Sequence, residues 1–318
     1  MKPEDIKNVV VIGTGMMGPG IAYSLASVGR DVIIWGRSTQ SIEKGVKACR
    51  EIVRTLVAEQ IVPEAAGAEA VARITGSTDL EHAVCEADLI TESIVEDVEV
   101  KRQLFVRIEN LCPSHTLLTS NTSGLPATQI ASRLQKPDRF AVTHFWNPPH
   151  LMPLVDVVKG EKTSQETIDT LIALLKEAGK KPVAVLKDTP GQLGNRLFHA
   201  LIREAIYIVQ QGIASVEDVD TAISNGFGRR TPAYGALEHQ DVVGLDMVYA
   251  IQSYMCEALC NETKPAEFFK ALVKSEKLGA KTGKGFYDWT KRDVNQVIER
   301  RDKFLLELLK AEKKIIIN

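Results

Sequence analysis

Short apolar runs alternate with segments of helical periodicity from the start of the chain. Residues 8–12 (NVVVI) form a β-branched run that is typical of a strand buried on both faces of a parallel sheet. Ile21, Leu25 and Val28 then recur at helical spacing, and residues 32–35 form a second buried strand. Further strand-like runs follow at residues 89–91, 116–119, 140–143, 154–158 and 183–186. The pattern predicts an α/β fold with a Rossmann-type, doubly wound parallel sheet.

Two long stretches depart from this alternation. After the second strand, apolar positions between Ile42 and Leu56 predict a long amphipathic helix, Pro63 begins a shorter one, and the chain rejoins the sheet at Ile74. From Gly191 onward the strand signals stop and helical spacing continues. We therefore predict an α/β domain over residues 1–188 with an inserted helical hairpin, an all-helical domain over 189–290, and a helical tail over 291–318. The expected apolar stripe of the tail consists of Val297, Phe304, Leu305 and Leu308.

A glycine-rich turn follows the first predicted strand directly. Gly13, Gly15 and Gly18, with Met16 and Met17 between them, match GxGxxG in a strand–turn–helix context. The first glycine permits the tight turn, the second lets the backbone approach a pyrophosphate, and the third lets helix and strand pack closely. The N-terminus of the following helix adds donors and a partial positive charge. The first domain is therefore predicted to bind a dinucleotide cofactor.

The end of the second strand lacks the acidic residue that usually accepts the ribose 2′-hydroxyl of NAD. Gly36, Arg37 and Ser38 stand there, and Asp31 begins the strand at its opposite end. A guanidinium and a hydroxyl are suited to a 2′-phosphate, so NADP is favoured over NAD. In the alternative, Arg37 stacks on the adenine and Ser38 caps the next helix.

Polar residues gather at the ends of two later strands, where open α/β sheets bind ligands. One segment is Ser120-Asn-Thr-Ser123, and the other is His144-Phe-Trp-Asn147 followed by two prolines. Asp156 lies within the apolar run 154–158, where a carboxylate needs a partner. Pairing it with His144 would fix the imidazole tautomer and leave the other nitrogen for a substrate hydroxyl, as hydride chemistry on an alcohol requires.

Composition narrows the possible partners. The 39 Lys and Arg against 41 Asp and Glu give a net charge of −2, so no basic footprint for nucleic acid or an anionic membrane is present. No secretory signal or membrane-spanning run is recognised, which predicts a cytoplasmic protein. The 5 cysteines lack ligand spacing, so no metal site is expected.

These motifs resemble the 3-hydroxyacyl-CoA dehydrogenase family over most of the chain. The residues that carry the resemblance are the glycine motif, Glu92-Ser-Ile-Val-Glu96, Ser120–Ser123, His144–Pro148, Asp188–Gly191 with Asn195-Arg196, and Lys284-Gly-Phe-Tyr287. The resemblance implies that His144 is the general base and that Asp156 orients it, at a position where the family has a Glu. It further implies substrate contacts for Ser123 and Asn195, a supporting role for Asn147, and cofactor contacts for Glu96, Lys101 and Asn121. It also implies a small-molecule substrate and a homodimer formed through the helical domain.

Two features leave the substrate open. The hairpin that in this family helps to hold the phosphates of coenzyme A has an acidic tip here, with Glu59, Glu64 and Glu69. The run from Asn147 to His150 is similar to side branches that act on free acids, L-gulonate 3-dehydrogenase (lambda-crystallin) and a pyridine-carboxylate dehydrogenase. In that case His150 and Arg229-Arg230 could meet a carboxylate.

Two further alternatives concern the class of protein. The chain lacks the lysine base of 3-hydroxyisobutyrate-type dehydrogenases on the helix that opens its second domain. A non-catalytic, crystallin-like protein would have no need of a polar His144–Asp156 pair. A dehydrogenase acting on a 3-hydroxy or 3-oxo acyl group, as a thioester or a free acid, therefore remains the main prediction.

Overall fold

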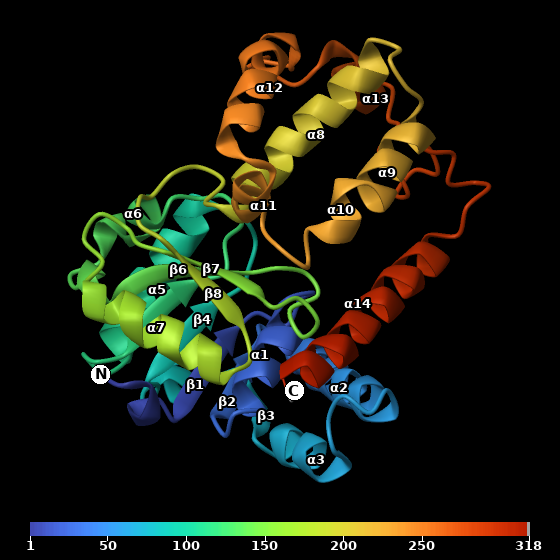
Figure 1. The fold of residues 1–318 in the computed structure, drawn as a ribbon. Coiled ribbons are helices and arrows are strands. Elements are labelled where there is room, and N and C mark those ends of the chain that lie inside the picture. The colour runs from blue at the N-terminus through green and yellow to red at the C-terminus, as the bar shows by residue number, and fades with distance from the viewer. Residues whose placement is uncertain (317–318) are drawn as a thin grey trace. The chain divides into compact units, whose positions relative to one another are not determined.

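The computed structural model describes residues 1–316, and the chain divides into two compact units (Figure 1). The first unit is Met1–Arg196 together with the chain from Arg300 onward, and the second is Leu197–Glu299. The unit boundary therefore lies just beyond the Pro-Gly segment at which the sequence predicted it. The tail helix begins at Val294 in the second unit, and from Arg300 onward it belongs with the first unit.

The first unit is built on an eight-stranded sheet in the order β3-β2-β1-β4-β5-β6-β7-β8. The strands are β1 (Asn8–Ile12), β2 (Asp31–Trp35), β3 (Ile74–Ser77), β4 (Leu89–Glu92), β5 (Leu117–Ser120), β6 (Phe140–Phe145), β7 (Leu154–Val158) and β8 (Lys181–Val185). Every neighbouring pair is parallel except β6 and β7, which are antiparallel. The predicted doubly wound α/β fold is confirmed. The reversal at β7 was not predicted, because a buried strand has the same apolar pattern in either direction.

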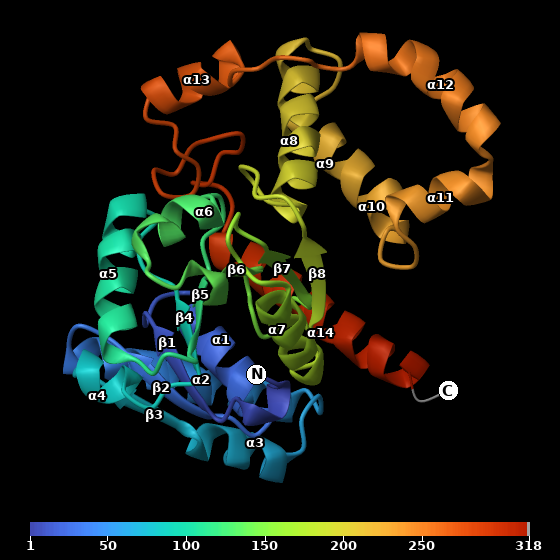
Figure 2. The same cartoon turned by 90° about the vertical axis from the view of Figure 1, so that its left-hand side faces the viewer.

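Helices cover both faces of this sheet (Figure 2). They are α1 (Gly18–Ala26), α2 (Thr39–Ala58), α3 (Glu64–Ala72), α4 (Leu80–Val84), α5 (Val98–Leu111), α6 (Ala127–Ile130), α7 (Gln165–Glu177) and the tail helix α14 (Val294–Ile316), with short 3-10 turns at Pro3–Asp5, Ala131–Arg133 and Pro137–Arg139. Along β1, Val9 and Val11 pack with α1, α2 and α7, whereas Val10 and Ile12 pack with α4, α5 and α6. The strand is thus buried on both faces, which its continuous apolar run required.

The tail helix α14 packs against the helical hairpin α2–α3. Leu306 is buried in the same cluster as Leu56 and Ile61, and Leu305 and Leu309 pack against that cluster. The ammonium of Lys310 lies 2.7 Å from a carboxylate oxygen of Glu59 at the end of the hairpin's first helix. Phe304, expected in the apolar stripe, is 62% exposed. Leu305 therefore packs as the predicted stripe requires, whereas the prediction for Phe304 is wrong.

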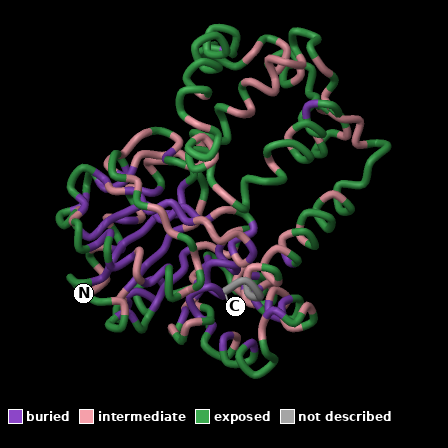
Figure 3. Tube along the Cα trace, viewed as in Figure 1, coloured by how far each residue is buried: buried purple, intermediate pink, exposed green. Residues whose placement is uncertain are grey.

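The described residues of the second unit form helices joined by turns and loops, with isolated antiparallel bridges between Gly279 and Lys284 and between Lys284 and Asp288. Its helices are α8 (Gly194–Gln210, which begins in the first unit), α9 (Val216–Asn225), α10 (Phe227–Arg230), α11 (Ala236–Val243), α12 (Leu245–Ala258) and α13 (Glu267–Lys274). Figure 3 shows buried positions concentrated along the strands of the first unit, while α11 and α12 are exposed. In the part of the chain that the structure describes, no helix combines the length and apolarity needed to cross a bilayer.

Candidate active site

The glycine-rich turn joins the C-terminal end of β1 to the start of α1. Gly13 has a φ of +123°, and a Cβ there would lie 2.3 Å from the carbonyl oxygen of Ser93. A Cβ on Gly18 would lie 2.0 Å from the carbonyl oxygen of Gly13, whereas nothing lies within 4 Å of a Cβ on Gly15. Gly13 and Gly18 therefore have no room for a side chain where helix and strand pack together, whereas the backbone at Gly15 is accessible to a pyrophosphate. Met16 beside it is 78% exposed, and Met17 caps α1.

The segment after β2 lies against the same turn. A Cβ on Gly36 would come within 2.8 Å of the Thr14 side chain, and the amide of Gly13 bonds to the carbonyl of Trp35 at 3.0 Å. Ser38 is the N-cap of α2, and its hydroxyl accepts a hydrogen bond from the Ser41 amide. Arg37 is exposed and makes no ion pair within residues 1–316. The Arg37 guanidinium can therefore bind a ligand, whereas the Ser38 hydroxyl already caps the N-terminus of α2.

His144 and Asp156 face each other across the one antiparallel pair of the sheet. They are directly opposite in the register of β6 and β7, and Nδ1 of His144 lies 3.1 Å from Oδ2 of Asp156. Opposed residues of antiparallel strands bring their side chains close on one face. The short Asp can therefore reach the imidazole without a longer side chain. Asp156 is fully buried, and within the described chain Nε2 of His144 has no protein hydrogen-bond partner.

Trp146 contacts this pair and was not singled out from the sequence. Its indole Nε1 donates to the same Oδ2 of Asp156 at 3.4 Å, and its ring lies 5.6 Å from the His144 ring. A Cβ on Gly194, at the start of α8, would lie only 2.6 Å from the indole. Oδ1 of Asp156 is buried without a partner among the described residues. The Trp146 indole thus lies between Asp156 and Gly194, the residue before Asn195.

Glu96 holds the loop that follows β5. Its carboxylate accepts hydrogen bonds from the Thr122 hydroxyl and from the amides of Ser123 (3.0 Å) and Gly124 (3.3 Å). Burial alone would raise the pKa of Glu96, but the Thr122 hydrogen bond and the charge of Lys101 outweigh it and hold the pKa below its ordinary value. The carboxylate is therefore ionised at neutral pH, and Ser123 stays exposed beside it.

Lys101 lies beneath the same loop in a buried network. Its ammonium is 2.5 Å from Oε1 of Glu92 and 3.6 Å from Glu96, and both Lys101 and Glu92 are almost completely buried. Glu92 also accepts hydrogen bonds from the Ile94 amide and from the hydroxyl of Ser120. The network ties the ends of β4 and β5 together. Sequence reasoning had placed Glu92 only within a motif, because its three partners are distributed along the chain.

The amide side chains near the loop are partly engaged. Asn121 accepts from the Phe145 amide at 2.8 Å, which ties the end of β5 to β6. Asn195 donates to the Ser123 carbonyl at 2.7 Å, and Gln192 donates to the Thr122 carbonyl at 2.9 Å. Asn147 is exposed. The structure therefore brings Ser123 and Asn195 together, and Gln192 is a further member of this cluster that the sequence did not indicate.

His150 lies away from these residues. Its ring lines a separate pocket with Tyr23 and Lys180, and none of the candidate catalytic side chains lines that pocket. Arg229 and Arg230 belong to α10 in the second unit. His150 therefore lies apart from the side chains around His144, and a carboxylate contact of Arg229 and Arg230 stays a prediction.

Family models and known proteins match this chain over most of its length. The model of the NAD-binding domain of 3-hydroxyacyl-CoA dehydrogenase matches residues 8–189, and that of the C-terminal domain of the same enzyme matches 191–289. The chain is 32% identical over 301 residues to 5-formyl-3-hydroxy-2-methylpyridine 4-carboxylate 5-dehydrogenase of Mesorhizobium japonicum, covering 95% of this chain and 96% of that one. It is 38% identical to the human mitochondrial hydroxyacyl-coenzyme A dehydrogenase, covering 89% and 91%.

One crystal structure is similar to this chain over nearly its whole length. The structure of 5-formyl-3-hydroxy-2-methylpyridine 4-carboxylic acid 5-dehydrogenase, an NAD⁺-dependent dismutase, superposes with a TM-score of 0.90 at 31% identity, covering 96% of this chain and 98% of that one. The chain belongs to the 3-hydroxyacyl-CoA dehydrogenase family. The predicted class, a dehydrogenase with a dinucleotide-binding domain, is confirmed.

Proposed function

We propose that this protein transfers hydride between a nicotinamide dinucleotide and a secondary alcohol or its ketone, with His144 as the proton acceptor and donor. The observation that carries the proposal is the 3.1 Å contact of His144 Nδ1 with the buried Asp156. This contact fixes the tautomer, so that Nε2 accepts the hydroxyl proton. When bound, the nicotinamide accepts or supplies the hydride. The open backbone at Gly15 supports binding of its pyrophosphate.

The buried carboxylate of Asp156 stabilises the protonated form of His144. When Nε2 takes the proton, the imidazole becomes positive and Asp156 remains ionised at its side, as in other His–carboxylate pairs. Ser123 is exposed near Asn195, whose amide donates to the Ser123 carbonyl. We assign these two side chains to the substrate oxygens and Asn147 to their support. We assign Glu96 and Asn121 to contacts with the cofactor, whereas Lys101, which is buried against Glu92, supports their loops from below.

The substrate that the structure favours is a small free acid without coenzyme A. The hairpin tip carries Glu59 and Glu64, and the nearby cation Lys310 is already paired with Glu59 at 2.7 Å. An acidic surface whose cation is neutralised is a poor place for the phosphates of coenzyme A. The tail helix α14, which lies beyond the residues matched by the family models, covers this hairpin. The relative that this chain matches over 95% of its length acts on a free pyridine carboxylate by name.

A spectrophotometric assay of cofactor oxidation and reduction tests this function. NADPH and NADH are each offered with acetoacetyl-CoA and free acetoacetate, and NADP⁺ and NAD⁺ with L-gulonate. We expect turnover of a free acid and little or none of the thioester. Comparable or faster turnover of acetoacetyl-CoA would show that the hairpin does not exclude coenzyme A, and the thioester would then be the substrate class. No turnover of any substrate by a protein that binds the cofactor would argue against the proposed activity.

We further propose that the cofactor pocket accepts NADP. Arg37 lies where a 2′-phosphate would emerge, next to the N-terminus of α2, and no carboxylate stands at this strand end to repel it. Arg37→Asp is expected to shift preference from NADPH towards NADH by at least tenfold in kcat/KM. Arg50→Asp, an equal charge change on the exposed side of α2, is the control. An unchanged preference in Arg37→Asp would contradict this assignment.

We propose a homodimer because the second unit exposes many hydrophobic side chains. Within its described residues only Val219 and Cys260 are buried hydrophobic residues, whereas Leu237, Val242 and Tyr249 are 83%, 81% and 77% exposed. A helical unit without its own core needs another surface to cover it. A second copy supplies that surface symmetrically. Light scattering is expected to give twice the chain mass for the native protein and a lower mass for Leu237→Lys/Val242→Lys. A native monomer would refute the proposal.

A further inference from the structure

A second polar pocket lies on the far half of α1, beneath the tail helix. Its volume is about 140 Å³, and its walls come from α1, the hairpin, the turn before β7, the turn before β8, and α14. Tyr23, Ser24, Ser27, His150 and Lys180 are its polar lining, and Leu56, Ile61 and Leu309 are part of its apolar lining. None of the residues assigned to the catalytic or dinucleotide site lines it.

Lys180 brings a positive charge to this pocket, and the nearest charged groups on α14, Asp302 and Arg301, form an ion pair with each other. Its ammonium donates to the carbonyls of Pro149 (2.5 Å) and Met152 (3.3 Å), and no carboxylate within residues 1–316 forms an ion pair with it. Burial lowers the pKa of Lys180 to about 8, so the ammonium is still charged at neutral pH. A partly buried charge without a counter-charge is costly, and an anion placed beside it would lower that cost.

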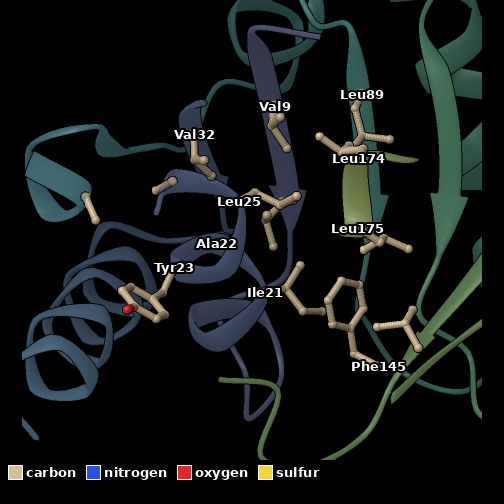
Figure 4. Packing of buried hydrophobic residues seen from close by; sticks show 14 of the residues in the cluster. Val9, Ile21, Ala22, Tyr23, Leu25, Val32, Leu89, Phe145, Leu174 and Leu175 are labelled. Carbon is tan, nitrogen blue, oxygen red and sulfur yellow. The ribbon is translucent and has the colours of Figure 1, made fainter. Parts of the chain in front are cut away.

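His150 and Tyr23 supply further donors to the same space. Nδ1 of His150 is buried and has no hydrogen-bond partner among the described groups. Burial, then the charge of Lys180, lower the pKa of His150 to about 4, although the charge of Asp302 opposes this shift. The ring is therefore neutral, and one nitrogen carries a proton to donate. Figure 4 shows Tyr23 projecting from α1 away from the contact between Ile21 and Phe145. Its hydroxyl is a third polar group at the pocket wall.

We propose that this pocket binds a small organic carboxylate. The anionic group would sit between Lys180, His150 and Tyr23, and its short apolar tail would lie against the aliphatic side chains from the hairpin and from α14. The volume suits such a ligand, since a cavity of about 150 Å³ holds a benzene molecule. The mixture of one cation with aliphatic walls favours a carboxylate with a carbon tail over inorganic phosphate.

The position of the pocket links it to the catalytic strand. Lys180 holds the turn from Pro148 to Met152, which follows His144 closely along the chain, and the remaining walls include both the hairpin and the tail. A bound acid would therefore contact all three segments. The proposal is independent of the proposed activity, because it concerns binding at residues outside that site.

Isothermal titration of the full-length protein with butyrate, acetate and inorganic phosphate, at equal ionic strength, tests the proposal. Lys180→Met is the principal variant and Tyr23→Phe a milder one, with Lys176→Met, an exposed lysine on α7, as the matched control. We expect butyrate to bind more tightly than acetate. Its Kd should rise at least tenfold in Lys180→Met and severalfold in Tyr23→Phe, and stay unchanged in Lys176→Met and His144→Ala.

Each other outcome counts against the proposal. Equal butyrate binding by the native protein and Lys180→Met would overturn it, as would binding lost in His144→Ala, which would place the acid at the catalytic site. Absence of carboxylate binding to the native protein would identify a water-filled cavity. Tighter binding of phosphate would overturn the ligand class. If Lys180→Met does not fold, Tyr23→Phe decides, because it removes only a hydroxyl.

Discussion

Replacing Asp156 by Asn removes the charge of the buried carboxylate while keeping its shape. Two donors, His144 Nδ1 at 3.1 Å and Trp146 Nε1 at 3.4 Å, face the same oxygen Oδ2. The amide oxygen of Asn should therefore take that place, so that the imidazole tautomer is preserved. What is lost is the attraction between the carboxylate and the imidazolium that forms when His144 takes the proton. At about 4 Å and an effective dielectric constant of about 20, that attraction amounts to ~4 kcal/mol.

A loss of this size corresponds to a fall in kcat of about 10³-fold. Stability should not fall with activity, because Asp156→Asn removes a charge that is fully buried and whose Oδ1 has no partner in the described chain. We expect the free energy of unfolding in urea to be unchanged or slightly higher. Steady-state kinetics and urea denaturation of Asp156→Asn are compared with Asp169→Asn, an exposed position on α7. Native turnover in Asp156→Asn, or parallel losses of activity and stability, would refute the reasoning.

Two further predictions concern the indole and the buried imidazole. Trp146→Phe keeps the aromatic packing but removes a hydrogen bond of about 1 kcal/mol, so kcat should fall roughly fivefold with KM unchanged. The control, Trp289→Phe in the second unit, should leave kcat unaffected. A change confined to KM would contradict a positioning role for Trp146. Because burial and the charge of Lys180 lower the pKa of folded His150 to about 4, below its unfolded value of 6.5, the unfolded chain binds more protons between these pH values. Stability should therefore decrease as pH falls from 6.5 to 4, by at most ~3 kcal/mol from this group. His150→Phe should flatten that decline in urea titrations, and an equally steep decline in the variant would show that other groups cause it.

Local periodicity predicted most of the sheet, because each buried strand carries its own apolar run. The strands 8–12 and 140–145 were found within a few residues of their observed bounds, and so was the hairpin. The reversed direction of β7 could not be predicted, since direction depends on which neighbour the strand meets. That reversal is what sets Asp156 opposite His144. The sequence could suggest the pair but not the register that makes it possible.

Contacts between distant segments account for the other differences. The pairing of Lys310 with Glu59 joins residues far apart in sequence, so the acidic hairpin tip looked free of cations when read alone. The side of α14 that is buried depends on this docking, which is why Phe304 was wrongly placed in the apolar stripe. Trp146 gave no local signal either, because an aromatic residue beside a strand end is ordinarily read as packing.

The most direct test of the proposed mechanism is the turnover of His144→Ala with the substrate that the native enzyme converts fastest. Because Nε2 of His144 is the proposed proton acceptor, kcat should fall about 10²–10⁴-fold. Cofactor affinity, measured by fluorescence titration with NADPH and NADH, should change little, because the dinucleotide turn lies on β1 and α1. Unchanged turnover with intact cofactor binding would contradict the role of His144 as the catalytic base.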